Sequence, residues 1–130
     1  MFRLLVAGGR NYYDYKFIDD TLTNWYDEVS GLYTEGLTVV HGDTAGVDRI
    51  AAQWAKYNSF IVEAYPADWK LHGKAGGAIR NAKMIESGLN YAILFPGGFG
   101  TDNMRHQLMK TKIEFREVLD TDGGEMYTKY

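Results

Sequence analysis

The sequence of 130 residues contains no cysteine, two prolines and three histidines, and it carries a formal net charge of -3. The absence of cysteine excludes disulfides, thiol catalysis and thiolate metal sites. The histidines are scattered without metal-ligand spacing, so we expect no metal site. The small negative charge provides no overall basic field that would attract nucleic acid, and we do not expect nucleic acid as a partner.

Long hydrophobic runs are also missing. The apolar run at residues 2–7 is too short for the core of a signal peptide and ends at Gly8-Gly9-Arg10. No stretch approaches the length that spans a bilayer, so we expect a cytoplasmic protein with no membrane partner. The chain is long enough for one domain with a hydrophobic core.

Glycine, in contrast, is abundant, with 15 residues in 130 against a usual share of about 7%. Ten of the glycines fall in four short segments, and three of these segments directly follow apolar runs that are typical of strands. The ten are Gly8, Gly9, Gly42, Gly46, Gly73, Gly76, Gly77, Gly97, Gly98 and Gly100.

Apolar runs predict strands at residues 2–7, 37–41, 60–64 and 91–95 and, more weakly, at 112–118. Apolar residues at helical spacing predict helices after Asp14, across residues 47–55 and 79–89, and from Thr101 or Asp102 onward. This alternation implies right-handed crossovers and a mainly parallel sheet of about five strands. We therefore predict an α/β fold, a Rossmann-like doubly wound domain over residues 1–118, followed by a polar C-terminal tail over residues 119–130.

In such a sheet, ligands bind beyond the carboxyl ends of the strands, at the point where the strand order reverses. The common order places the first strand between the second and the fourth, so three glycine-bearing loops are expected to converge there. These loops hold Gly8, Gly9 and Arg10, then Gly42 and Gly46, and then Gly97, Gly98, Gly100 and Thr101. Glycine lets backbone N–H groups approach an anion, helix N-termini attract one, and Arg10 is suited to clamp phosphate. The alternative is that these glycines form tight turns and nothing more.

A fourth segment, Pro66–Asn81, combines an aromatic residue, cations and a glycine pair. Trp69 is suited to stack on a base, Arg80 to pair with phosphate or carboxylate, and Asn81 to read a base edge. The alternative is that Trp69 fills the core and that Arg80 forms a structural bridge to Asp43 or Asp48.

Several familiar cofactor and catalytic signatures are absent. The first glycine loop lacks the third glycine of G-x-G-x-x-G, and Gly73-Lys74 is followed by Ala75 rather than by the Ser or Thr of a P-loop. No G-x-S-x-G elbow occurs. The sequence thus predicts no dinucleotide cofactor, and we expect no other cofactor.

The motifs Gly8-Gly9-Arg10, His41-Gly42 with Asp48, Pro66 to Trp69, Arg80-Asn81 with Met84, and Phe95 to Thr101 occur in this order. Together they resemble the YspA-like branch of the SLOG superfamily, the Rossmannoid group that includes the Smf/DprA and LOG (Lonely Guy) proteins. The resemblance implies a nucleotide or nucleotide-derived ligand, a role as a sensor of nucleotide signals, and self-association into a homo-oligomer. An aromatic interface for the oligomer, or alternatively a cap on the sheet edge, could come from Tyr12, Tyr13, Tyr15 and Tyr26.

The chain also resembles the LOG phosphoribohydrolases, in which glutamates follow the Pro-Gly-Gly-x-Gly-Thr motif. Here those positions hold Asn103 and Met104, neither of which replaces a carboxylate, and the catalytic residues are unknown, with Asp48 and Asp68 as candidates. The first hypothesis is therefore a small-molecule binding or sensor protein, and a LOG-like nucleotide hydrolase is the alternative. A DprA-like binder of single-stranded nucleic acid is a third hypothesis, which the net charge disfavours.

Overall fold

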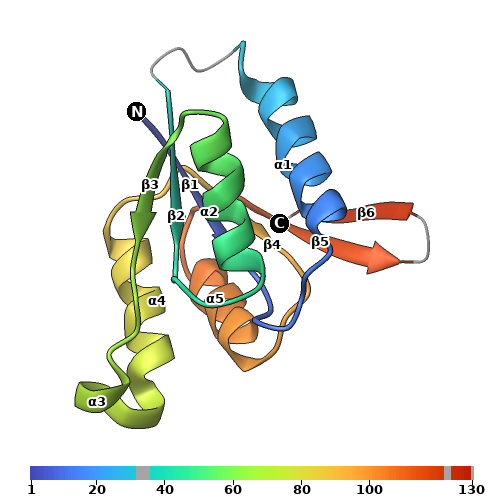
Figure 1. Cartoon of the computed structure of the whole chain (residues 1–130). Helices are drawn as coiled ribbons and strands as arrows, with labels where there is room; N and C mark the ends of the chain where they lie inside the picture. Colours follow the sequence, from blue (N-terminus) through green and yellow to red (C-terminus); the bar gives the residue numbers. More distant parts are fainter. Residues whose placement is uncertain (32–35, 122–123, 130) are drawn as a thin grey trace.

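The computed structural model describes residues 1–31, 36–121 and 124–129 (Figure 1). Its centre is a six-stranded sheet with the order β3-β2-β1-β4-β5-β6. The first five strands along the chain are parallel, and β6 is antiparallel to β5. The strands are β1 (Phe2–Ala7), β2 (Leu37–His41), β3 (Ile61–Ala64), β4 (Tyr91–Leu94), β5 (Phe115–Thr121) and β6 (Gly124–Lys129). This order confirms the predicted Rossmann-like doubly wound fold.

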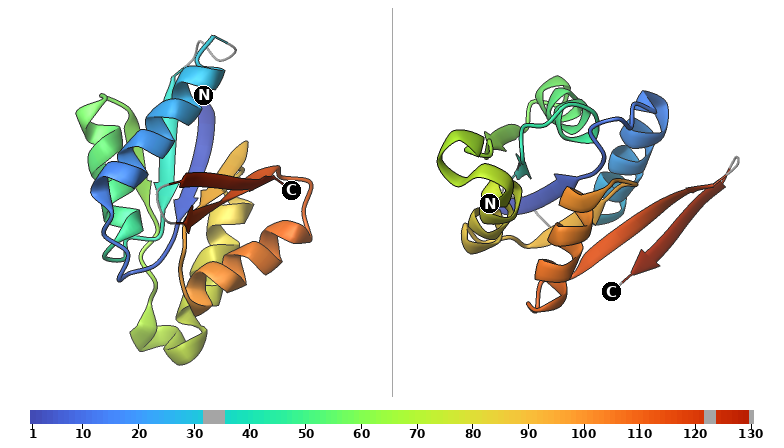
Figure 2. Two further views of the ribbon diagram at one scale, coloured as in Figure 1. Left: turned by 90° about the vertical axis from the view of Figure 1, so that its right-hand side faces the viewer. Right: turned by 90° about the horizontal axis from the view of Figure 1, so that it is seen from below.

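Helices cover both faces of this sheet (Figures 1 and 2). Side chains of α1 (Tyr15–Val29) and α2 (Val47–Tyr57) pack in the core on one face, together with Leu4 and Val6 of β1. Side chains of α4 (Gly76–Glu86) and α5 (Phe99–Met109) pack on the other face, together with Leu5 of β1. Successive strand residues point to opposite faces, so a strand that is covered on both faces becomes continuously apolar.

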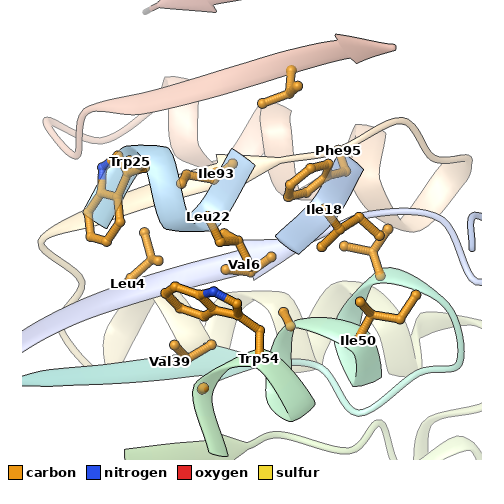
Figure 3. Close-up of a cluster of buried hydrophobic side chains, with 14 of the residues drawn as sticks. Leu4, Val6, Ile18, Leu22, Trp25, Val39, Ile50, Trp54, Ile93 and Phe95 are labelled. Atoms are coloured by element: carbon orange, nitrogen blue, oxygen red, sulfur yellow. The ribbon is translucent and has the colours of Figure 1, made fainter. Parts of the chain in front are cut away.

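The core under α1 and α2 is the larger of the two clusters, and Figure 3 shows its interlocking side chains. Trp54 of α2 packs in this core and donates its indole N–H to Thr23 Oγ1 of α1 at 3.0 Å. Asp14 caps the start of α1, as predicted, because its carboxylate accepts the N–H of Phe17 at 3.1 Å. The Trp54–Thr23 hydrogen bond therefore joins α1 and α2, the helices that follow the first two strand-end loops.

The helices on the other face differ in two ways from the sequence-based expectation. Helix α5 begins at Phe99, earlier than Thr101, because Gly98 serves as its N-cap. In α4, the positions with the strongest burial include Arg80 and Asn81, whereas the apolar Ile79 and Ile85 are half-buried. The face of α4 that points inward is thus partly polar, which an analysis of apolar spacing alone does not detect.

Two shorter elements lie between β3 and α4. Helix α3 (Trp69–His72) is a single helical turn, and a 3₁₀ turn (Gly73–Ala75) links it to α4. In Figure 1, α3 lies at the lower end of the molecule, beside the start of α4.

The segment after residue 118, for which the sequence predicted a polar tail, contains the end of β5 and the whole of β6. Antiparallel pairing joins the two strands from Arg116↔Lys129 to Thr121↔Gly124. An edge strand presents unpaired backbone groups, and a polar segment can pair with them without any hydrophobic pattern. The described part of this segment therefore extends the sheet. Within the ranges that the structure describes, no helix combines the length and the apolar character that crossing a membrane requires.

Candidate functional site

A cavity of about 560 Å³ opens beyond the carboxyl ends of β1 and β4. These two strands are neighbours, while the chain continues from β1 to β2 on one side and returns to β4 on the other, so the cavity lies at the switch point of the sheet. Four segments line it, with the residues Ala7, Gly8, Gly9, Arg10, Asn11, Tyr12, Thr44, Asp48, Arg80, Asn81, Met84, Pro96, Gly97, Gly98, Phe99, Gly100 and Thr101.

The structure brings ten of the 13 predicted ligand-binding residues to this cavity and leaves Gly42, Gly46 and Trp69 outside its lining. Gly42 and Gly46 have a packing role instead. A Cβ atom on Gly42 would lie 2.4 Å from Arg80 Nη1, and one on Gly46 would lie 2.2 Å from the carbonyl oxygen of Gly9. Gly46 also has a φ of +76°, which L side chains rarely adopt.

The three strand-end loops are in direct backbone contact. Gly9 donates its N–H to the carbonyl of Pro96 at 2.8 Å, and its own carbonyl accepts the N–H of Val47 at 3.2 Å. A Cβ atom on Gly97 would lie 2.8 Å from the Gly9 nitrogen. Several of the glycines are thus required for the loops to approach one another, and the cavity wall is fixed by hydrogen bonds between loops.

The N-terminus of α5 forms one side of the cavity. Its N-cap is Gly98, which has no side chain that could accept the N–H groups of the first turn. Positions 98 and 100 have open space where a Cβ atom would be, with no described atom from elsewhere in the fold within 4 Å. Helix N-termini carry a partial positive charge and unpaired N–H donors, so this side of the cavity suits an anion.

Arg80 supplies a cation from the inner side. It is 8% exposed, and its Nη1 donates to the Gly42 carbonyl at 2.6 Å while Nε donates to Asn81 Oδ1 at 2.9 Å. Its Nη2 donates to no residue that the structure describes. Burial lowers the pKa of Arg80, the negative charge of Asp48 raises it, and the positive charge of Arg10 lowers it further. Arg80 and Arg10 are therefore close enough to repel each other, and both line the cavity.

Asp48 lies beside these cations and is 4% exposed. Its Oδ2 accepts the Gly42 N–H at 3.1 Å, the Thr44 hydroxyl at 3.1 Å and the Thr44 N–H at 3.4 Å. Its Oδ1 is buried and has no hydrogen-bond partner among the described residues. Burial raises the pKa of Asp48 to about 6, although the hydrogen bonds from Thr44 and Gly42 and the charge of Arg80 oppose this shift.

The structural bridge from Arg80 to Asp43 or Asp48 does not form as an ion pair within the described part of the chain. Arg80 instead donates to the backbone carbonyl of Gly42. Asp43 pairs with Arg49, whose Nε lies 3.7 Å from Asp43 Oδ1. Trp69 does not fill the core either, because it is 50% exposed and packs against the backbone at Gly76.

Other candidate residues hold the loops together or stand apart from the cavity. Asn81 donates to the Gly100 carbonyl and to Asn103 Oδ1, both at 3.1 Å, and so joins α4 to the start of α5. Met104 is fully buried in the core under α4 and α5. Asp68 caps α3 by accepting the N–H of Leu71 at 3.0 Å.

Burial lowers the pKa of His41, whose Nδ1 accepts the N–H of Asp43. Within the described ranges, no group of three or more His, Asp or Glu side chains could hold a metal ion.

Two residues of the cavity that the structure makes prominent were not among those predicted from the sequence. Thr44 binds Asp48, and Phe99 is 96% exposed at the first position of α5. The available signal for Phe99 was its place between two glycines, whose lack of side chains leaves an aromatic ring without neighbours to pack on.

Comparison with known proteins gives two matches. Residues 2–72 match the family model described as the YspA, cpYpsA-related SLOG family. The Gene 61 protein of Mycobacterium phage D29 is 36% identical over 120 residues, which are 87% of this chain and 93% of that protein. No solved structure matches the chain. The name of the phage protein states no activity, so the chemistry of the cavity carries the functional argument.

Proposed function

Because this chain belongs to the YspA, cpYpsA-related SLOG family, we propose that it binds a nucleotide or nucleotide-derived small molecule in the cavity between β1 and β4 and acts as a sensor of that ligand. Family membership supports a nucleotide-related role, in binding or in hydrolysis. The lining of the cavity favours the phosphate group as the main point of attachment.

The observation that carries this proposal is the side chain of Arg80. Arg80 is 8% exposed and lines the cavity, and its Nη2 has no hydrogen-bond acceptor among the described residues. A guanidinium edge that no protein acceptor occupies is suited to an anionic oxygen, which binds it more strongly than a neutral acceptor. Exposed Arg10 and the N-terminus of α5 add two further attractions for the same anion.

Hydrolysis is the second candidate, and the raised pKa of Asp48 favours it, because a carboxyl group with a pKa of about 6 is suited to general acid catalysis. The geometry of Asp48 argues for binding instead. Its Oδ2 accepts three hydrogen bonds and its Oδ1 is buried, so neither oxygen is free to meet a substrate in this conformation. Release of free base or phosphate that is abolished by Asp48→Asn would establish the hydrolase.

The binding proposal can be tested by thermal shift with ribonucleoside monophosphates, NAD derivatives and cyclic nucleotides at millimolar concentration. A ligand that binds the folded state raises the melting temperature by mass action. We expect Arg10→Gln to reduce the shift. Arg49→Gln is the matched control, because Arg49 is an exposed arginine of α2 outside the cavity lining, and it should leave the shift unchanged. If no compound stabilises the protein, the proposal is wrong.

We also propose that the chain forms a homo-oligomer. Tyr13 and Tyr15 support this, since they are 50% and 54% exposed at the start of α1 and their ring centroids lie 6.4 Å apart. Tyr26, by contrast, packs on Phe60 inside the protein. Native mass spectrometry would give the number of subunits, and a monomer at micromolar concentration would contradict this part of the proposal.

A further inference from the structure

Phe99 is an aromatic side chain for which the fold provides no packing partner. It is 96% exposed, more than any other large hydrophobic residue in the described part of the chain. It also lines the cavity, whereas Tyr57, which is nearly as exposed, does not. An isolated exposed apolar residue needs no explanation on an open surface, but this ring lies at a cavity whose other features attract anions.

The position of Phe99 relative to the anion site is defined by the chain itself. It is the first residue of α5, so its backbone belongs to the helix turn that offers free N–H groups. Arg80, which is more than nine-tenths buried, lines the same cavity, and its Nη2 has no acceptor among the described residues. One ligand can therefore contact both the aromatic ring and the anion-binding groups.

The space around the ring is open on both sides along the chain. Its neighbours are Gly98 and Gly100, which have no side chains, and no described atom from elsewhere in the fold lies within 4 Å of a Cβ position on either of them. A flat molecule can thus approach the Phe99 ring without meeting an adjacent side chain. Planar bases stack on exposed aromatic faces in this way, whatever their hydrogen-bonding edges.

We propose that Phe99 is the stacking surface for the planar base of the ligand, so that the cavity takes a base-bearing nucleotide in preference to a bare sugar phosphate. This inference rests on the proposed function, because the phosphate must be held at α5, Arg10 and Arg80 for the base to reach the ring. Tyr12, which also lines the cavity from the loop after β1, brings a second aromatic residue to the same space.

The test compares ligands that differ by the base. Isothermal titration calorimetry would measure dissociation constants for the four ribonucleoside 5′-monophosphates and for ribose 5-phosphate. At least one nucleotide should bind the natural protein five-fold or more tightly than ribose 5-phosphate, in line with the contribution of one stacked base. Phe99→Ala and Phe99→Leu should abolish this preference and leave the affinity for ribose 5-phosphate unchanged. Phe99→Tyr should keep the preference.

The outcomes separate this inference from the proposed function. If nucleotides and ribose 5-phosphate bind the natural protein equally and Arg10→Gln weakens both, the anion site stands and the stacking role is wrong. If Phe99→Ala weakens both kinds of ligand to the same extent, Phe99 shapes the helix N-terminus and the inference is overturned. If Phe99→Ala changes the number of subunits and not the preference, the ring belongs to an interface between copies, which also overturns it. If no phosphate compound binds, both proposals fall.

Discussion

Gly46 and Gly9 are in backbone contact, since a Cβ atom on Gly46 would lie 2.2 Å from the Gly9 carbonyl oxygen. The same Gly9 donates its N–H to the Pro96 carbonyl, so one residue connects the loops after β1, β2 and β4. The cavity is therefore built on contacts between main chains, which do not depend on side-chain rotamers. A wall of this kind is already in place before a ligand binds, which reduces the ordering that binding requires.

Replacement of Gly46 by alanine should destabilise the protein. The new Cβ atom would meet the main chain of Gly9 and Arg10, and the φ of +76° is unfavourable for alanine. We expect a loss of at least about 2 kcal/mol in the free energy of unfolding, measured by urea denaturation. Gly31→Ala is the control, because no described atom beyond its chain neighbours lies within 4 Å of its Cβ position, and it should change the stability little. Equal effects of the two substitutions would refute the close contact.

Asp48 should make the stability of the protein fall as the pH rises from about 4 to about 6. Its pKa in the folded state is about 6, above the ordinary value of 3.8, so the folded protein binds more protons than the unfolded chain in this range. At neutral pH the ionised Asp48 lowers the free energy of unfolding by roughly 2 to 3 kcal/mol, which follows from the size of its pKa shift.

Asp48→Asn should remove this dependence. Urea denaturation of both proteins at several pH values between 4 and 7 gives the difference between their unfolding free energies. This difference isolates Asp48 from His41, whose lowered pKa makes the stability rise as the pH approaches 6.5. The variant should gain stability relative to the natural protein as the pH rises, and parallel profiles would show that Asp48 is not the cause.

The contribution of Glu63 to the stability of the protein should depend on pH in the opposite sense, and at lower pH. Hydrogen bonds from the Arg3 guanidinium and the Tyr65 hydroxyl lower the pKa of Glu63 to about 2. Its contribution to stability is therefore complete above the ordinary pKa of 4.5 and is lost as the pH falls from there toward 2.

Glu63→Gln should accordingly destabilise the protein at pH 6 and have no effect near pH 2, as followed by thermal unfolding. The effect will be modest, because the Glu63 side chain is 38% exposed and solvent screens the pair. Glu86→Gln, at an exposed glutamate of α4, serves as the control for the loss of one negative charge. A constant destabilisation at all pH values would point to lost packing instead of lost charge.

The parts of the fold that the sequence predicts well are those where local patterns and tertiary burial agree. The limits of β1 and β2 match the apolar runs at 2–7 and 37–41, because each run ends at a glycine where the chain must turn. The Asp14 cap is equally local, since it depends on an N–H three residues away. The role of β6 is not local, because a polar strand at the edge of a sheet depends on its partner for hydrogen bonds.

In the candidate site, too, some features can be predicted from the sequence and others depend on contacts with distant residues. The sequence predicts that the loops with Gly8 and Gly97 converge, because strand order alone brings them together. It does not separate Gly46, which contacts a distant main chain, from Gly98, which faces open space, since both are glycines in a loop. The burial of Arg80 in α4 is also hidden, because a charged residue on an inward face contradicts the hydrophobic pattern unless its acceptors, here Gly42 and Asn81, are known.

The most direct test of the phosphate site is an NMR titration of ¹⁵N-labelled protein with the four ribonucleoside 5′-monophosphates and, in parallel, with the four nucleosides. The two ligand sets differ by the phosphate alone. We predict that the backbone amide signals of residues 98–101 and the side-chain signal of Arg80 shift with at least one monophosphate and do not shift with the matching nucleoside. Equal shifts with both ligands, or shifts confined to residues outside the cavity, would contradict a phosphate site at the N-terminus of α5.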